Sequence, residues 1–265
     1  MLLALLTLAG CDALNKARDT IDGLLEPVVV QGVVLGIEPP QSQDLQDLLD
    51  QSEFQSGTTA TIFMADATEV SEIENAPIAG ATVSLLGTGA GVTLTEIDAG
   101  VYSLAPGADP LEYASGETWE LESVRGSGDS QQVSTAQVRL PAAVDFSNEI
   151  PEQHEVSVAI DLDFTGQPYD SALIVVLDDE GNVTYSNEPQ TIREVYEFTQ
   201  GSTELGVITI PATAFPDEGI FMVGVAGMVN TDAADLDEMN TGLSSVISGL
   251  MRTYAVSTLP IPPVP

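Results

Sequence analysis

The chain has 265 residues, of which 41 are acidic and 6 are basic, and its formal net charge at pH 7 is −35. A charge of this size repels phosphates and anionic lipid headgroups, which argues against nucleic acid and anionic membrane surfaces as electrostatic partners. Hydrophobic residues nevertheless make up 43% of the sequence, so the chain can bury a core and is not a disordered acidic tail.

The chain begins with an apolar leader that ends at its single cysteine. Residues Leu2–Gly10 are too few to span a bilayer, which takes about 20 apolar residues, but they match the length of a signal-peptide core. The leader closes on Leu8-Ala9-Gly10-Cys11, which resembles the lipobox of bacterial lipoproteins. The resemblance implies that residues 1–10 are a signal peptide, that Cys11 is lipidated, and that the protein is anchored to a membrane of the bacterial cell envelope.

The residues around Cys11 leave parts of this interpretation open. A signal peptide normally starts with a basic residue, whereas this chain starts Met1-Leu2-Leu3, so we expect either a true start further upstream or a truncated fragment. The alternative is a buried helix with Cys11 in the core, but charged residues follow directly, from Asp12 onward. Asp12 resembles the inner-membrane retention signal of enteric lipoproteins; that rule varies between bacteria, so inner and outer membrane both stay open. We expect residues 11–26 to form a lipidated tether.

Residues 27–145 are rich in strand signals. Pro27–Ile37 reads as a largely buried strand, and Asp44–Phe54 as a short helix with its leucines on one face. Runs rich in Thr, Val and Ile, bounded by Gly, Pro and Asp, then predict further strands. With the first strand they make about seven strands in roughly 115 residues, the count and spacing of a β-sandwich. The runs are Thr58–Ala65, Ala81–Leu86, Val92–Ile97, Val101–Leu104, Thr118–Val124 and Val133–Leu140.

Two segments of this half carry a resemblance to known modules. The segments are Pro77-Ile78-Ala79-Gly80-Ala81-Thr82-Val83-Ser84-Leu85 and Ala99-Gly100-Val101-Tyr102-Ser103-Leu104. They are similar to the immunoglobulin-like and transthyretin-like modules of secreted bacterial proteins, including the carboxypeptidase regulatory-like type. Related envelope lipoproteins continue with strands like Gly116–Leu121 and Thr135–Pro141. The resemblance implies a sandwich fold and a spacer, adhesive or binding role, and it names no ligand.

Residues 146–265 predict a second β-sandwich, after a boundary at Pro141–Pro151. Val156–Phe164 alternates apolar and polar residues, as a half-buried strand does, and Ala233–Leu250 has the apolar spacing of a helix. Pro260–Pro265 predicts an extended tail. The fold class is therefore mainly all-β, with two sandwiches in tandem and a short helix in the second. The other predicted strands are Ala172–Leu177, Val183–Tyr185, Ile192–Phe198, Leu205–Ile210, Ile220–Val229 and Tyr254–Leu259, with a turn at Asp178–Asn182.

Few side chains in the sequence offer catalytic chemistry. His154 is the only histidine, and it lies between a proline and a strand, which favours an exposed linker residue over a catalytic base. One histidine and one lipidated cysteine cannot supply the three or four N/S ligands of a zinc site. The glycine-rich Gly87–Gly91 lacks the spacing of a dinucleotide-binding loop and predicts a hairpin turn.

Carboxylates are the abundant functional groups of this chain. Asp161 and Asp163 share the outward face of one predicted strand, and Asp178, Asp179 and Glu180 fall within one predicted turn. Oxygen ligands of this kind suit Ca²⁺, which takes about 6–8 of them, although neither group has the spacing of an EF-hand loop. The five residues are therefore the calcium candidates, and solvated surface acids are the alternative interpretation.

We thus expect a non-enzymatic envelope lipoprotein that acts as a structural or protein-interaction module without a cofactor. Its expected partners are the membrane, through the lipid, and an envelope protein or surface polymer. The alternative is a ligand-binding lipoprotein that captures Ca²⁺ or a small solute for a transporter or surface complex.

Overall fold

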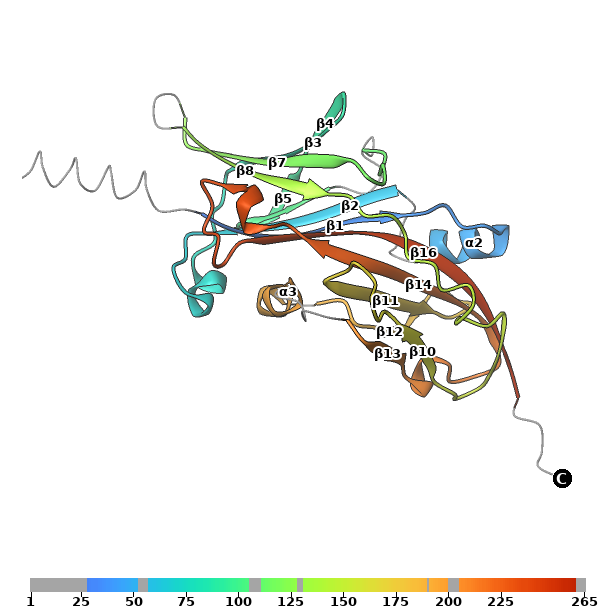
Figure 1. Ribbon diagram of the computed structural model, residues 1–265. Coiled ribbons are helices and arrows are strands. Elements are labelled where there is room, and N and C mark those ends of the chain that lie inside the picture. Colours follow the sequence, from blue (N-terminus) through green and yellow to red (C-terminus); the bar gives the residue numbers. More distant parts are fainter. Residues whose placement is uncertain are drawn as a thin grey trace, which may run out of the picture.

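A computed structural model of the chain describes residues 28–51, 57–104, 111–127, 131–189, 191–199 and 205–260 (Figure 1). Strands dominate this part and its two α-helices are short, which confirms the prediction of a mainly all-β protein. Cys11, the leader and the tether lie outside the described residues, as does the tail from residue 261 onward.

The largest sheet, which we call the central sheet, takes strands from both halves of the sequence. Its first strand, β1 (Val29–Ile37), pairs in parallel with the last, β16 (Ser245–Leu259). The strand order is β12-β11-β14-β16-β1-β2-β6-β5, with β9 alongside the end of β16. The remaining strands are β2 (Gly57–Ala65), β5 (Thr95–Asp98), β6 (Val101–Ser103), β9 (Gln153–Glu155), β11 (Ser171–Leu177), β12 (Val183–Ser186) and β14 (Gly219–Asn230).

This topology corrects the prediction of two sandwiches in tandem. The predicted division at residue 145 would leave β1 and β2 in one domain and β16 in the other, yet the three strands are hydrogen-bonded neighbours. The halves are therefore joined by a shared sheet. The sequence pattern could not reveal this, because strand signals give the position of a strand in the chain and not its neighbour in space.

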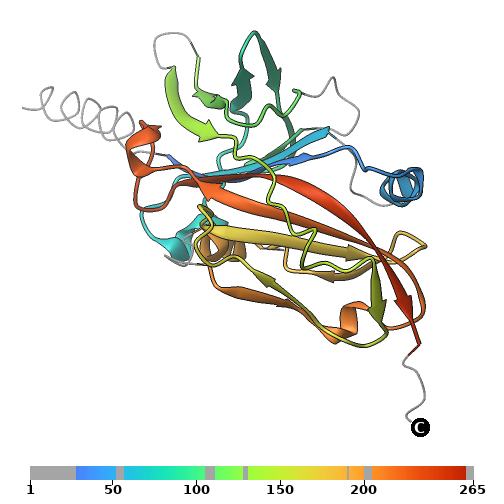
Figure 2. The same cartoon turned by 45° about the vertical axis from the view of Figure 1, so that its right-hand side comes forward.

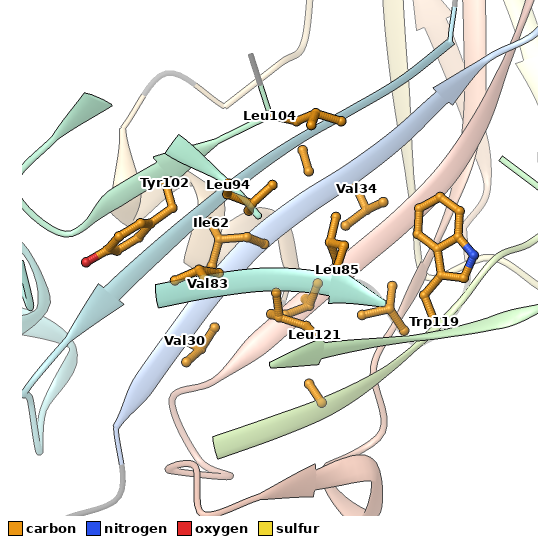
Figure 3. Close-up of a cluster of buried hydrophobic side chains, with 14 of the residues drawn as sticks. Val30, Val34, Ile62, Val83, Leu85, Leu94, Tyr102, Leu104, Trp119 and Leu121 are labelled. Carbon is orange, nitrogen blue, oxygen red and sulfur yellow. The ribbon is translucent and has the colours of Figure 1, made fainter. Parts of the chain in front are cut away.

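A second sheet, the cover sheet, packs on one face of the central sheet. Its strands run in the order β15-β8-β7-β3-β4. The two sheets enclose a core in which Trp119 of the cover sheet and Ile62 of the central sheet are almost wholly buried (Figure 3). Most strands of this sandwich come from residues 27–145, and β15 and β16 come from the second half of the chain. The cover strands are β3 (Thr82–Gly87), β4 (Ala90–Thr93), β7 (Thr118–Arg125), β8 (Gln132–Arg139) and β15 (Leu236–Asp237).

Further along the same face, a strand pair covers the other end of the central sheet. β10 (Ile160–Asp163) and β13 (Val207–Ile210) pair antiparallel and enclose a second core, which includes Val256 of β16. Val246, of the first core, lies an even number of residues before Val256, so both side chains point to one face of β16. Figures 1 and 2 show the chain crossing this face between the two cores.

The opposite face of the central sheet is covered by helices. α2 (Gln43–Gln51) places Leu45, Leu48 and Leu49 in a cluster with residues of β1, β11, β14 and β16, as its predicted apolar face requires. α3 (Ile192–Thr199) and the short 3₁₀ helix η1 (Val70–Asn75) cover the region around the start of β1. Two further single 3₁₀ turns are η3 (Ala212–Ala214) and η4 (Ala233–Asp235).

Two predicted elements have the wrong type. Ile192–Phe198 was expected as a strand and is α3; Thr191 and Glu194 form a reciprocal capping box, in which each backbone N–H donates to the other's side-chain oxygen at 3.2 Å. Ala233–Leu250 was expected as a helix and contains η4, β15 and the start of β16. β16 is buried on both faces there, so its sequence lacks the alternation that marks a half-buried strand.

Candidate functional site

His154 lies in β9 and is engaged in the fold. Its Nε2 is 2.9 Å from the backbone carbonyl oxygen of Val158, and its ring packs edge-on against Phe215 with centroids 5.2 Å apart. The side chain is half-buried at the end of β16. His154 was expected to be an exposed linker residue. It is instead a packed strand residue, held by its contacts with Val158 and Phe215.

The two aspartates of β10 each have a local hydrogen-bonding partner. The carboxylate of Asp161 accepts a hydrogen bond from the Thr209 hydroxyl at 2.6 Å, across the β10–β13 pair. The carboxylate of Asp163 accepts one from the backbone N–H of Thr165 at 2.9 Å, and hydrogen bonds to Thr165 lower the pKa of Asp163. Both aspartates point outward, as predicted, and each is hydrogen-bonded to a different threonine.

The acidic turn after β11 is closed by its own side chains. Asp178 accepts hydrogen bonds from the backbone N–H groups of Glu180 and Asn182 at 3.0 and 2.8 Å. The side-chain amide of Asn182 also donates to Asp178 and to Glu180. Asp178 thus stabilises the turn. Within the described residues, no group of three or more His, Cys, Asp or Glu side chains could hold a metal ion, so the five calcium candidates are not brought together.

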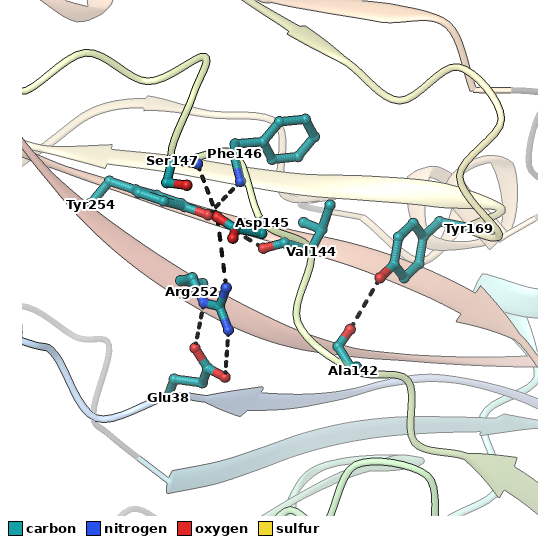
Figure 4. A network of polar contacts seen from close by, with 9 residues as sticks. All are labelled: Glu38, Ala142, Val144, Asp145, Phe146, Ser147, Tyr169, Arg252 and Tyr254. Carbon is teal, nitrogen blue, oxygen red and sulfur yellow. Dashed lines mark hydrogen bonds and ion pairs between the residues drawn. The ribbon is translucent and has the colours of Figure 1, made fainter.

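The most elaborate polar arrangement lies between the two cores, at the segment Pro141–Ile150, which we call the seam. Three tyrosines bind backbone atoms of the seam, and Figure 4 shows two of them, Tyr169 and Tyr254. The hydroxyls of Tyr113 and Tyr169 donate to the carbonyl oxygens of Pro141 and Ala142 at 3.1 and 3.2 Å. The hydroxyl of Tyr254 accepts from the backbone N–H of Phe146 at 2.8 Å and donates to the carbonyl of Val144 at 3.3 Å.

Two glycines make room for the tyrosine rings on the sheet. A Cβ at Gly36 would lie 2.5 Å from the ring of Tyr113, and a Cβ at Gly227 would lie 2.6 Å from the ring of Tyr169. Both glycines are register partners of Leu250 on β16, one from each side. Because these glycines have no side chain, each tyrosine ring can lie against the strand backbone. The hydroxyl of each ring then reaches the seam.

Arg252 of β16 joins the seam to β1. Its guanidinium contacts the carboxylate of Glu38, with Nε–Oε2 and Nη2–Oε1 distances of 2.7 and 3.3 Å, and it lies 3.8 Å from Asp145 of the seam. The hydrogen bond to Glu38 raises the pKa of Arg252. Hydrogen bonds from Ser147 lower the pKa of Asp145. A bidentate contact of this kind fixes geometry as well as charge.

Sequence reasoning did not identify the seam as a fastened segment. It read Pro141–Pro151 as a boundary because the segment has two prolines and no long apolar run. The signal that could have found the contact is the position of Arg252, a basic residue in an apolar stretch of a chain that has only 6 Lys and Arg in total. The three tyrosines gave no such signal, because they come from separate parts of the sequence.

Neither α-helix among the described residues is long and apolar enough to cross a membrane. Cys11, the predicted lipidation site, lies outside the described residues, so its prediction stays a prediction. No protein-family model matches the chain, and no curated protein matches its sequence.

Proposed function

We propose that this protein is a non-enzymatic lipoprotein of the bacterial cell envelope, lipidated at Cys11, that acts as a structural or protein-interaction module. The observation that supports this best is the parallel pairing of β1 with β16. The chain enters the central sheet at Val29 and leaves it after Leu259, and parallel strands carry these two points to opposite ends. At about 3.3 Å per residue, the 15 residues of β16 extend over roughly 50 Å.

This arrangement suits a module that holds one end near a membrane and presents the other end away from it. The N-terminal end follows the proposed anchor, and β9, β12 and the end of β16 lie at the far side of the central sheet. A net charge of −35 disfavours adsorption of the body to anionic headgroups, which keeps the far end free for a partner.

The absence of a catalytic role is supported by how the candidate residues are used. His154 packs against Phe215, and Asp178 closes a turn. The two segments that resemble immunoglobulin-like and transthyretin-like modules contact each other through Tyr102. Its hydroxyl donates to the Ile78 carbonyl at 2.8 Å and accepts from the Ala81 N–H at 3.0 Å. Such modules serve as spacers and binding units, which agrees with the proposal.

Membrane fractionation tests the anchor. Cys11→Ser removes the only thiol that can take the lipid, so we expect the variant in the high-speed supernatant and the wild-type protein in the membrane pellet. Asp12→Asn is the matched control, because it alters the next residue and leaves the thiol in place. It should stay in the pellet, and its distribution between inner and outer membranes reports on retention. A Cys11→Ser variant that stays in the pellet would contradict the lipid anchor.

A further inference from the structure

The first and last strands of the described chain are central neighbours, and this has a mechanical consequence. β1 and β16 pair in register from Gln31 with Ser245 to Ile37 with Met251. Because the strands are parallel, tension between the start of β1 and the end of β16 pulls them in opposite directions along their length. All hydrogen bonds of the ladder then bear the tension at the same time. Tension that separates the two strands at one end of the pair instead breaks the bonds one after another.

Neither strand is an edge strand that could peel away alone. The other side of β1 is fully paired with β2, from Val29 with Ala65 to Ile37 with Gly57. The other side of β16 is paired with β14 from Thr258 back to Ile247. Sliding β1 past β16 therefore also requires the core side chains on both faces to move past each other.

Contacts outside the ladder lock the pair near the start of β1. The N–H of Val30 donates to the Ser244 hydroxyl at 3.0 Å, and the N–H of Asn240 donates to the Val28 carbonyl at 2.9 Å. The buried side-chain amide of Gln31 donates to the Leu243 carbonyl at 3.0 Å. These bonds join β1 to the turn that leads into β16, so they resist the same sliding motion.

A second lock lies near the end of β1. The N–H of Glu38 donates to the Met251 carbonyl at 2.9 Å, and the Glu38 carboxylate holds the guanidinium of Arg252 (Figure 4). The side chains of this ion pair are 27% and 31% exposed, so the pair is partly shielded from solvent. The β1–β16 pair is thus fastened before and after its ladder.

We propose that this protein bears tension: the β1–β16 pair is a shear clamp that transmits tension between the membrane end and the far end of the molecule. This rests on the proposed function, because only a protein held at both ends experiences tension along this axis. The clamp requires that the far end be attached to a second layer of the envelope, since an unattached ligand exerts no load.

Single-molecule force spectroscopy tests the clamp through its direction dependence. The full chain carrying Cys11→Ser would be pulled from handles at its two termini. A second geometry would use the same N-terminal handle and a cysteine at Thr241→Cys, an exposed turn residue on the starting side of β16. The first geometry shears the β1–β16 pair, and the second peels it. We expect a higher unfolding force between the termini at equal pulling speed. Equal forces, or a lower force between the termini, would overturn the proposal.

Variants locate the lock. Arg252→Gln should lower the unfolding force between the termini and leave the peeling force unchanged, because peeling starts at the other end of the pair. Arg193→Gln removes an exposed ion pair with Glu197 in α3 and should change neither force. If Arg252→Gln does not fold, Glu38→Gln removes the same contact from the other side. An unchanged shear force in a folded variant would contradict the role of this ion pair.

The two proposals fail in different ways. A Cys11→Ser protein that remains membrane-bound contradicts the lipid anchor and says nothing of the clamp. If Cys11→Ser is released as expected but the unfolding force is the same in both pulling directions, the lipid anchor stands and the shear clamp is contradicted.

Discussion

Tyrosine hydroxyls hold much of the polar structure between the two cores. Tyr113, Tyr169 and Tyr254 each bind backbone atoms of the seam, and Tyr102 binds the loop before β3 in the same way. Burial raises the pKa of all four phenols from the ordinary value of 10.0, because the charged form is poorly solvated in these positions. The fold therefore favours the protonated phenols.

This predicts loss of stability at alkaline pH. The unfolded chain loses its phenolic protons near pH 10, before the folded chain does, so the contribution is complete below pH 10 and is lost as the pH rises through the folded-state pKa values. Tyr254→Phe should reduce this alkaline loss. At pH 8 it should also lower the free energy of unfolding by about 1–2 kcal/mol, because the backbone groups of Val144 and Phe146 lose a half-buried partner.

Urea unfolding between pH 8 and 11 measures both effects. Tyr185→Phe, which removes the hydroxyl of a half-buried tyrosine of β12 outside the seam, is the matched control. An alkaline slope that is identical in Tyr254→Phe and in the wild-type protein would show that the seam tyrosine does not contribute.

At the scale of elements, local signals predict strands well and their partners poorly. β1, β2, β3, β7 and β11 were predicted from Val- and Thr-rich runs, and α2 from its apolar face. The predicted Val92–Ile97 strand is split between β4 and β5, which belong to different sheets. The outward aspartates and the acidic turn were also predicted correctly. The seam was not, because its contacts join positions far apart in the chain, from 27 residues for Tyr169 and Ala142 to 110 for Tyr254 and Val144.

The shared central sheet predicts one cooperative unfolding transition. Residues 27–145 and 146–265 cannot unfold separately without breaking the β1–β16 ladder and the seam contacts. Calorimetry should therefore show a single transition whose calorimetric and van't Hoff enthalpies agree. The fragment 27–145 expressed alone should not reach a folded state. In this fragment β1 would keep β2 on one side but would lose its partner β16 on the other. Two resolved transitions, or a folded 27–145 fragment, would contradict the shared sheet as the unit of stability.

The whole molecule is dominated by its negative charge. Three of the described arginines form ion pairs with acids: Arg139 binds Asp232 and Asp235, Arg252 binds Glu38, and Arg193 binds Glu197. Most of the 41 acidic residues have no basic residue to balance them, because the chain has only 6 Lys and Arg. Repulsion among these carboxylates destabilises the compact state, and salt screens it over about 10 Å at roughly 0.1 M.

Salt should therefore raise the melting temperature smoothly, and Ca²⁺ should add nothing specific. Thermal melts in increasing NaCl test the first statement. Ca²⁺ titrated at fixed high NaCl tests the second, because a specific site stabilises by mass action even when the general field is screened. A saturable rise in melting temperature with Ca²⁺ would favour the cation-binding alternative, and Asp178→Asn would show whether the acidic turn is responsible.

The central claim is that the protein is held to a membrane by lipid at Cys11 and extends away from it. The most direct measurement is mass spectrometry of the protein extracted from membranes after cleavage with trypsin, which cuts after Lys16. If Cys11 is the lipid anchor, the peptide begins at Cys11 and carries two or three acyl chains, which is the number that firm membrane binding requires. An unmodified Cys11, or a peptide in which Gly10 still precedes it, would contradict a lipid anchor at Cys11.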